Sequence, residues 1–421
     1  MDQRAHRFFA AALAGIGGRL VGLLAPLVTT PALLSYFGDE EFGIWATSVS
    51  ATSIAVVADL GIGNGLLTRV ASASGRGDRK SIRAYVSNAY VALSAVATIA
   101  LSITTMAFLV WPVSPIAVAV VVVFIMSLPG TVLYQFLYGI QRVPTSNLLL
   151  AVGAAGSVLG CFLAIGAQAP TWAVAVAYSL PPVLTSIGGA IWFFRRAPEY
   201  RPTLNAVSWQ HARDLLKLGS GFFFLSILTA VGLNIDNLII SATAGPEAVP
   251  PYAIPMRLAS VLSLLIMAVF MPLWGANGEA LATRDYNWVR QSALNMSLAG
   301  AGVVAISGGM LILLSNMIMT VWIGRTFEDQ HLVLSFAVLA ATIIAATSPY
   351  NMVLNALGRP LPQIGPWLAF VILSISLKLA LLIGQQRVWP IAAVTGLVYA
   401  LVVTPVVIVA ALRGLRTEAG R

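Results

Sequence analysis

The sequence predicts an all-α polytopic membrane protein, and three observations carry that prediction. Apolar residues make up 58% of the 421 residues, and charged residues make up only 9%. The mean hydropathy is +0.88. The apolar residues are also gathered in runs long enough to cross a bilayer. A soluble globular protein carries about 25% charged residues, so this composition excludes soluble enzymes, secreted disulfide scaffolds and disordered proteins.

Twelve apolar runs are predicted to span the membrane. A bilayer core about 30 Å thick requires about 20 mostly apolar residues in each helix, and the breaks between the runs are charged or turn-like. The first run is expected to be a retained helix and not a signal peptide, because Arg19 interrupts it and no small-x-small cleavage site is clear. The predicted spans are residues 12–35, 44–68, 87–110, 116–140, 147–168, 172–194, 219–243, 253–275, 293–315, 332–355, 364–384 and 389–412.

The positions of the lysines and arginines predict the orientation of the chain. Of the 24 residues of these two types, nineteen fall in loops on the side of the N-terminus, and only Arg325 and Arg387 fall in loops on the other side. Cytoplasmic loops carry an excess of Lys and Arg, so both termini are expected in the cytoplasm. The net charge of +9 is therefore attributed to topology and to contact with anionic lipid headgroups, and not to nucleic-acid binding.

A basic loop in the middle of the chain divides six predicted spans from six others. The expected organisation is an N-lobe (1–194), a cytoplasmic linker (195–218), a C-lobe (219–412) and a cytoplasmic tail (413–421). The linker contains an amphipathic stretch, which is expected to lie as a helix on the inner membrane surface. Docking of a partner protein is the alternative role for this stretch.

The two halves show weak sequence similarity at an offset of 207 residues. Residues 38–40 match residues 245–247, and Asp78 matches Asp285. Equal span counts and these matches favour a duplicated six-helix unit. Because six is an even number, both copies enter the membrane from the same side, which makes a parallel repeat about an axis normal to the membrane.

Five ionisable residues lie within predicted spans: Arg19, Asp59, Asp236, Arg257 and Lys378. A charge in hydrocarbon costs several kcal/mol, so each should face a partner or a wet cavity. One interpretation is mutual neutralisation, with Arg19 paired to Asp59 and Asp236 paired to Arg257 or Lys378. The other is a cavity with surplus positive charge that binds a phosphate or a carboxylate. The candidate substrate-binding residues are therefore Arg19, Asp59, Arg257 and Lys378.

Asp236 is the candidate residue for ion coupling. An intramembrane carboxylate can take up H⁺ or Na⁺ and so link transport to an ion gradient. Asn234 and Asn237 lie beside it in the sequence and offer further oxygen atoms. We expect these three residues to form the coupling site.

Prolines and glycines in the first two spans are the candidate hinge. Pro26 and Pro31 fall in the first span, and Gly61 and Gly63 fall in the second. Proline inside a helix removes a hydrogen bond and bends the helix, so a bent first span beside a glycine-rich second span suits a moving gate. The Gly-x-x-x-Gly motif at 156–160 is expected to allow close helix packing.

The sequence contains no signature of an enzyme, a cofactor or a metal site. A single cysteine, Cys161, and three separated histidines exclude a metal cluster, and no phosphate-cradling loop is present. Four functions then stay open: a transporter of an anionic substrate, a cation-coupled exporter of small drugs, a membrane-embedded sugar ligase or polymerase, and a scaffold that recruits synthesis enzymes. Short outer loops argue against the ligase, and the surplus of buried cations argues against the drug exporter.

Three stretches give the chain a family resemblance. Residues 33–45 (LLSYFGDEEFGIW), 58–65 (ADLGIGNG, followed by Arg69) and 234–241 (NIDNLIIS) resemble bacterial polysaccharide and O-antigen flippases. These belong to the polysaccharide transport family of the multidrug/oligosaccharidyl-lipid/polysaccharide exporter superfamily. The chain lacks the two extra C-terminal spans of lipid II flippases, which weakens a role in peptidoglycan synthesis.

The resemblance implies a V-shaped arrangement of two six-helix lobes around a central cavity, working by alternating access. It also implies a substrate made of an oligosaccharide on undecaprenyl pyrophosphate, used for O-antigen, capsule or exopolysaccharide synthesis. The expected place is the bacterial inner membrane, and a polysaccharide polymerase or assembly protein is a further expected partner. The resemblance implies cationic cavity residues that hold the anionic headgroup, and Arg19 lies in the first span where one is expected. Asp59 matches the aspartate of the family's DLG stretch, whereas Arg257 and Lys378 match no motif.

Overall fold

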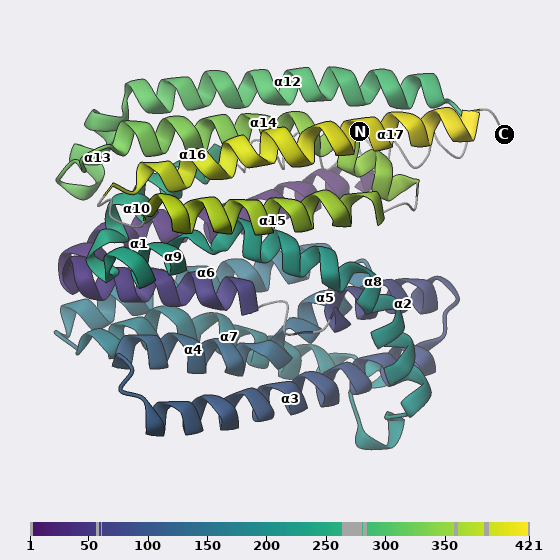
Figure 1. Cartoon of the computed structure of the whole chain (residues 1–421). Helices are drawn as coiled ribbons and strands as arrows, with labels where there is room; N and C mark the ends of the chain where they lie inside the picture. Colours follow the sequence, from purple (N-terminus) through teal and green to yellow (C-terminus); the bar gives the residue numbers. More distant parts are fainter. Residues whose placement is uncertain are drawn as a thin grey trace. The chain divides into compact units, whose positions relative to one another are not determined.

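The computed structural model is almost entirely helical (Figure 1). It describes the backbone of residues 3–55, 59, 61–262, 280, 284–357, 361–382 and 387–419, and their side chains apart from residues 3–20, 23, 218, 220–222 and 382. The described residues form helices, turns and short connections, with no strand among them. The chain divides into two compact units, residues 1–227 and 228–421.

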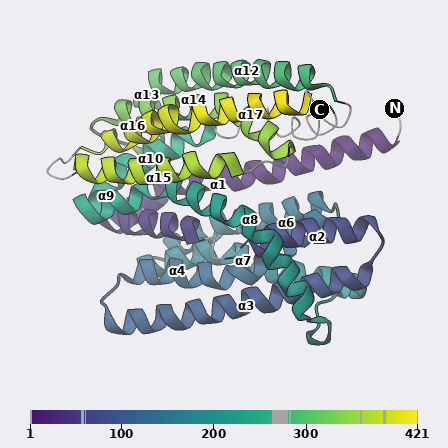
Figure 2. The same cartoon turned by 45° about the vertical axis from the view of Figure 1, so that its right-hand side comes forward.

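The first unit is built from seven helices and the first part of an eighth. Helix α7 packs against α6 and α4, α1 packs against α6, and α2 packs between α3 and α5. The two views of Figures 1 and 2 show α3, α4, α6 and α7 running side by side. The helices are α1 (Gln3–Ala55), α2 (Ile62–Gly75), α3 (Arg79–Val110), α4 (Pro115–Ser127), α5 (Thr131–Gly139), α6 (Val143–Gly166), α7 (Thr171–Arg196) and α8 (Trp209–Asn234).

In the second unit α14 is the central helix. It packs against α12, α10, α16 and α17, and α15 packs against α16 and α9. The last predicted span is bent through a π-helical turn, Tyr399–Val403, between α16 and α17. The helices are α9 (Asp236–Ala244), α10 (Pro250–Ala259), α12 (Tyr286–Leu313), α13 (Ser315–Ile323), α14 (Gln330–Ala356), α15 (Leu361–Leu382), α16 (Trp389–Val398) and α17 (Thr404–Ala419).

Eight of the described helical segments are long and apolar enough to cross a membrane. A ninth span is formed if α8 from Phe223 and α9 count as one helix bent by 47°. Nine predicted spans lie on these helices. Of the other three, 12–35 lies in α1, 44–68 is divided between α1 and α2, and most of 253–275 lies outside the described residues. The chain is thus a multi-pass membrane protein, and the count of twelve spans stays a prediction.

The predicted second span is preceded by a break at Gly38 and interrupted by a turn at Gly61. Gly38 lies in the break expected before residue 44, and its non-helical backbone (φ 72°, ψ 178°) separates two helical segments that α1 joins. The interior of the span differs from the prediction, because α2 begins at Ile62 after Gly61, whose φ is 74°, and Asp59 lies before that helix start. Both positions depend on glycine, because residues with a side chain rarely adopt a positive φ.

The connection between the predicted spans 293–315 and 332–355 is partly helical. Residues 315–323 form a short helix, α13, and the connection to α14 is correspondingly shorter. Two ion pairs hold this region, from Arg387 to Glu328 at 3.6 Å and to Asp329 at 3.7 Å.

Local geometry is the same at two pairs of positions that the 207-residue offset aligns. Gly38 and Gly245 both combine a positive φ with an extended ψ, at φ 72°, ψ 178° and φ 91°, ψ 160°. Asp78 and Asp285 both cap a following helix, because each carboxylate accepts the backbone N–H three residues on at 3.0 Å. A free N–H at a helix start requires such an acceptor.

Residues 197–217 belong to the first unit and pack against its helix α3. Arg83 of α3 donates to the Arg201 carbonyl at 2.9 Å, and Ser87 accepts the Thr203 N–H at 3.0 Å. The amphipathic stretch 209–217 is not a separate helix, since it continues directly into α8. The assignment of residues 195–218 as a cytoplasmic linker stays a prediction.

Candidate functional site

Asp236 is positioned by a break between two helices of the second unit. Helix α8 ends at Asn234 and α9 begins at Asp236, with a bend of 47° between them. Asn and Asp favour such breaks because their side chains bond to the nearby backbone. The side chain of Asn234 does so here, donating to the Ala230 carbonyl at 2.9 Å. Asp236 thus occupies the first turn of α9, where the helix dipole favours a carboxylate.

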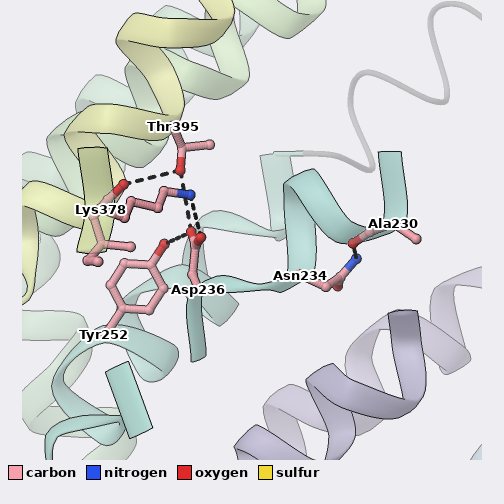
Figure 3. A network of polar contacts seen from close by, with 7 residues as sticks. Ala230, Asn234, Asp236, Tyr252, Lys378 and Thr395 are labelled. Carbon is pink, nitrogen blue, oxygen red and sulfur yellow. Dashed lines mark hydrogen bonds and ion pairs between the residues drawn. The ribbon is translucent and has the colours of Figure 1, made fainter. Parts of the chain in front are cut away.

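Three side chains from three other helices point toward the Asp236 carboxylate (Figure 3). Lys378 of α15 donates from Nζ to Oδ1 at 2.5 Å. Tyr252 of α10 donates a short hydrogen bond from its hydroxyl to Oδ2. Thr395 of α16 lies with Oγ1 at 3.4 Å from Oδ2. We call these four residues the Asp236 cluster.

The Asp236 cluster is removed from solvent. Lys378 is 0% exposed, Tyr252 is 2% exposed and Asp236 is 6% exposed. Moving one ion from water into a protein interior costs several kcal/mol, and the pair recovers this only with good geometry and further hydrogen bonds. Here the ammonium neutralises the carboxylate, and the tyrosine hydroxyl satisfies the second oxygen.

Thr395 is the weakest partner in the Asp236 cluster. Its hydroxyl has one hydrogen, and it lies 3.1 Å from the Ile391 carbonyl but 3.4 Å from Asp236. The shorter contact is the better hydrogen bond. Thr395 can therefore donate to Asp236 only if it gives up its hydrogen bond to the Ile391 carbonyl.

The structure gives the Asp236 carboxylate one of the two cations that the sequence offered, Lys378. Arg257 is half-buried on α10, about one turn beyond Tyr252. The side chain of Asn234 bonds to its own helix and points away from the carboxylate (Figure 3), and Asn237 is the second residue of α9. The expected coupling site of Asp236 with Asn234 and Asn237 stays a prediction.

In the first unit Asp59 acts as a local cap. Its Oδ1 accepts the Gly61 N–H at 2.8 Å, and its Oδ2 accepts the Gly63 N–H at 3.2 Å. The Asp-x-Gly-x-Gly spacing in the sequence was the signal for this turn. Arg19 lies in α1, and its side chain is outside the described residues, so the expected ion pair with Asp59 stays a prediction.

The candidate hinge glycines pack tightly in the first unit. Gly61 has φ 74°, and a Cβ built on it would lie 2.4 Å from the carbonyl oxygen of Gly219 in α8. A Cβ on Gly63 would lie 2.7 Å from Asp59 Oδ2. The expected close packing of the motif at 156–160 is confirmed, since a Cβ on Gly160 would lie 2.4 Å from the Ala177 carbonyl oxygen.

The candidate hinge prolines lie inside α1, which continues through both. The hydroxyl of Thr30 donates to the Pro26 carbonyl at 2.5 Å, and that of Thr29 donates to the Ala25 carbonyl at 2.9 Å. Both hydroxyl groups thus bond to carbonyls one turn back in the same helix.

Sequence reasoning missed Tyr252 and Thr395. Tyr252 lies 16 residues from Asp236 and Thr395 lies 159 residues from it. Neither is a charged residue in an apolar run, which was the signal that identified Lys378. No spacing in the sequence indicated that these hydroxyl groups face the carboxylate.

Comparison with solved structures defines the class of fold. An inward-facing multidrug-resistance MATE transporter of the MOP superfamily matches with a TM-score of 0.72 and 13% identity, over 96% of this chain and 99% of the other. An outward-facing MATE transporter of the same superfamily matches with a TM-score of 0.68 and 14% identity, over 97% and 95%. The chain therefore has the fold of a MOP-superfamily membrane transporter.

Comparison of sequences then identifies the family. The family model described as polysaccharide biosynthesis protein matches residues 11–274, well over half of the chain. The chain belongs to this polysaccharide biosynthesis protein family. A Yersinia pseudotuberculosis protein described as a candidate O-antigen export protein is 21% identical over 368 residues, which cover 82% of each chain. The family resemblance expected from the three sequence stretches is thus confirmed, and these relatives are named as exporters and transporters, in agreement with a non-enzymatic role.

Proposed function

We propose that this protein is a flippase of the bacterial inner membrane that moves an undecaprenyl-pyrophosphate-linked oligosaccharide from the inner to the outer leaflet. The observation that carries the proposal is the combination of a polysaccharide biosynthesis family with a transporter fold. The description of the Yersinia relative as a candidate O-antigen exporter supports the same substrate class. Both termini lie in the cytoplasm in this proposal, as the excess of Lys and Arg in alternate loops indicates.

The proposed mechanism is alternating access by two six-helix lobes, with twelve spans in a V around a central cavity. The shared geometry of Gly38 with Gly245, and of Asp78 with Asp285, supports a duplicated unit. The likeness to transporters in both inward-facing and outward-facing states supports a cycle between those states. The glycine and proline residues of the first two predicted spans, at positions 26, 31, 61 and 63, are the proposed hinge.

Substrate binding in this proposal rests on Arg19 and Arg257. A guanidinium can donate two parallel hydrogen bonds to a phosphate, so either side chain suits the pyrophosphate. Asp59 supports the site indirectly, because its hydrogen bonds to the backbone fix the turn before α2. Lys378 has a carboxylate as its neighbour, and we propose that it joins the substrate site only when this ion pair opens.

Coupling in this proposal uses H⁺ and depends on the Asp236–Lys378 pair. The ammonium of Lys378 lies at the carboxylate, where a metal cation would otherwise bind. Uptake of a proton by Asp236 removes its negative charge and so weakens its attraction for Lys378. Asn234 bonds to its own helix, so Na⁺ binding would require that contact to break, and Asn237 is the further oxygen donor of the proposed site.

The test is flipping in proteoliposomes. A labelled undecaprenyl-pyrophosphate oligosaccharide is followed from one leaflet to the other, with and without an imposed pH or Na⁺ gradient. We expect protein-dependent flipping that a pH gradient accelerates, loss of flipping in Arg19→Ala, and loss of the gradient response in Asp236→Asn. The matched control is Arg416→Ala, which removes an exposed charge. Absence of flipping by a folded wild-type protein would refute the proposal.

A second candidate function is cation-coupled export of small drugs. The observation that favours it is the likeness of the fold to multidrug-resistance transporters. Export of a fluorescent cationic drug from the same vesicles, with no movement of the lipid-linked sugar, would select this function.

A further inference from the structure

A groove of about 410 Å³ lies on the first unit, between α3, α7 and the connection that follows α7. Tyr90 of α3 lines one wall, and Ile191 and Phe194 of α7 line the other. Two arginines, Arg195 and Arg201, also belong to its lining. The complete lining is Tyr90, Ala190, Ile191, Phe194, Arg195, Arg201 and Pro202.

The groove changes from apolar to cationic along α7. Ile191 and Arg195 are four residues apart, so they lie on the same helix face about 6 Å apart along the axis. Helix α7 ends one residue after Arg195, and a spanning helix ends where the headgroups of the bilayer begin. The arginines thus lie at headgroup level, and the apolar wall, with Ile191 half exposed, lies at the level of the acyl chains.

The two arginines of the groove have no anionic partner within the described part of the chain. Both side chains are exposed, and neither guanidinium makes a hydrogen bond or an ion pair with a described residue. Other arginines of the same surface are paired: Arg69 with Asp214 at 3.7 Å, and Arg79 with Glu199 at 3.8 Å. Two arginines without a described anionic partner therefore lie at the edge of one mostly apolar groove.

Neighbouring contacts hold the groove in shape. Arg83 donates to the Arg201 carbonyl at 2.9 Å, and the ring of Tyr200 packs against Phe136 with centroids 5.6 Å apart. Tyr90 packs edge-on against Phe194 with centroids 6.2 Å apart. The connection that carries Arg201 is thus held against α3 by Arg83 and against α5 by the contact of Tyr200 with Phe136.

We propose that this groove is a binding site for an anionic phospholipid of the bilayer, separate from the transport site. Arg195 and Arg201 bind the headgroup phosphate, since guanidinium groups form strong charge-assisted hydrogen bonds with phosphate oxygens. One acyl chain lies over Ala190 and Ile191. A free phosphate would leave this apolar wall uncovered, and the positive ammonium group of a zwitterionic lipid would be repelled by the two guanidinium groups.

The experiment is a lipid titration of the full-length protein in detergent, with bound lipid counted by native mass spectrometry. The probes are phosphatidylglycerol and phosphatidylcholine with the same acyl chains. We expect wild-type protein to bind phosphatidylglycerol more tightly. Each arginine near a headgroup contributes about fivefold in affinity, so Arg195→Ala with Arg201→Ala should weaken phosphatidylglycerol binding about 25-fold.

Three further variants separate charge, groove and folding. Arg213→Ala with Arg416→Ala removes the same charge from exposed positions elsewhere and should keep the wild-type affinity. Arg195→Lys with Arg201→Lys should keep most of the phosphatidylglycerol binding that the two alanine substitutions remove. Ala190→Trp should block the acyl chain while both arginines remain. Thermal unfolding of each variant checks that it is folded.

Three results would overturn the proposal. Equal loss in the Arg213/Arg416 control would mean that only total charge matters. Equal binding of the two lipids by wild-type protein would mean that the groove does not select an anion. Full competition by glycerol phosphate, at the affinity of the intact lipid, would assign the site to a free phosphate.

Discussion

The ion pair in the Asp236 cluster predicts a specific pattern of stability in three variants. Lys378→Met keeps most of the length of the side chain and removes the charge, which leaves the Asp236 carboxylate buried with Tyr252 as its strongest remaining donor. Asp236→Asn leaves the buried ammonium of Lys378 without an anion. The double variant removes both charges and leaves a polar but neutral contact.

The expected magnitudes follow from the burial of the pair. Lys378 is 0% exposed and Asp236 is 6% exposed, so solvent cannot replace the lost partner. Removal of one member of a buried pair costs about 3–5 kcal/mol. For a unit the size of residues 228–421, each kcal/mol shifts the midpoint of thermal unfolding by about 2–4 °C. Each single variant should therefore unfold about 6–20 °C below the wild type, and the double variant should lose less than the sum of the two.

The assay is thermal unfolding of the purified protein in detergent, read as the temperature at which it leaves the folded peak in size exclusion. Lys80→Met, which removes an exposed lysine, is the control for loss of a positive charge and should change the midpoint by less than about 2 °C. Strict additivity of the two single variants, with a coupling below about 0.5 kcal/mol, would refute the reasoning. The pair would then contribute no mutual stabilisation, and protonation of Asp236 would not weaken any attraction that holds Lys378 in place.

Three other predictions concern the first unit. Gly61→Ala should lower the unfolding midpoint, because the new Cβ meets a backbone carbonyl of α8 at 2.4 Å and φ is 74°. The control is Gly75→Ala at the other end of α2, where a Cβ meets nothing within 4 Å. Equal midpoints for the two variants would contradict this. Asp78→Ala should lower the midpoint at neutral pH. Hydrogen bonds from Ser81 lower the pKa of Asp78 below its usual 3.8, so this difference should persist down to about that pH and vanish as the pH falls through the lowered pKa; a pH-independent difference would be the wrong result. Cys161 is fully buried, so maleimide should label it slowly in folded protein and fast after unfolding.

The membrane class and the positions of most spans followed from sequence alone. In hydrocarbon the backbone groups of a spanning segment must form hydrogen bonds within their own helix. A long apolar run therefore predicts an α-helix. Helices α6 and α7 start within four residues of their predicted boundaries for this reason. The exception is the turn at Gly61, inside the predicted second span, where glycine gives the backbone a freedom that hydropathy does not record.

The partners of the buried charges could not be read from the sequence. The run around Asp236 showed a carboxylate that needed a partner, and both Arg257 and Lys378 were available at similar depth. The structure brings Lys378 to the carboxylate and directs Asn234 toward Ala230. A rotation of α15 by one residue, about 100°, would have moved the lysine away, and no feature of the local sequence sets that rotation.

The sequence by itself thus determined that the chain is a helical membrane protein, and it indicated the polysaccharide exporter family through three short stretches. Only the tertiary structure decided that Tyr252 and Thr395 join Asp236, and that Arg195 and Arg201 line one groove. The physical reason is that the apolar length of a helix is a local property, whereas the direction of each side chain depends on how helices far apart in the sequence pack against one another.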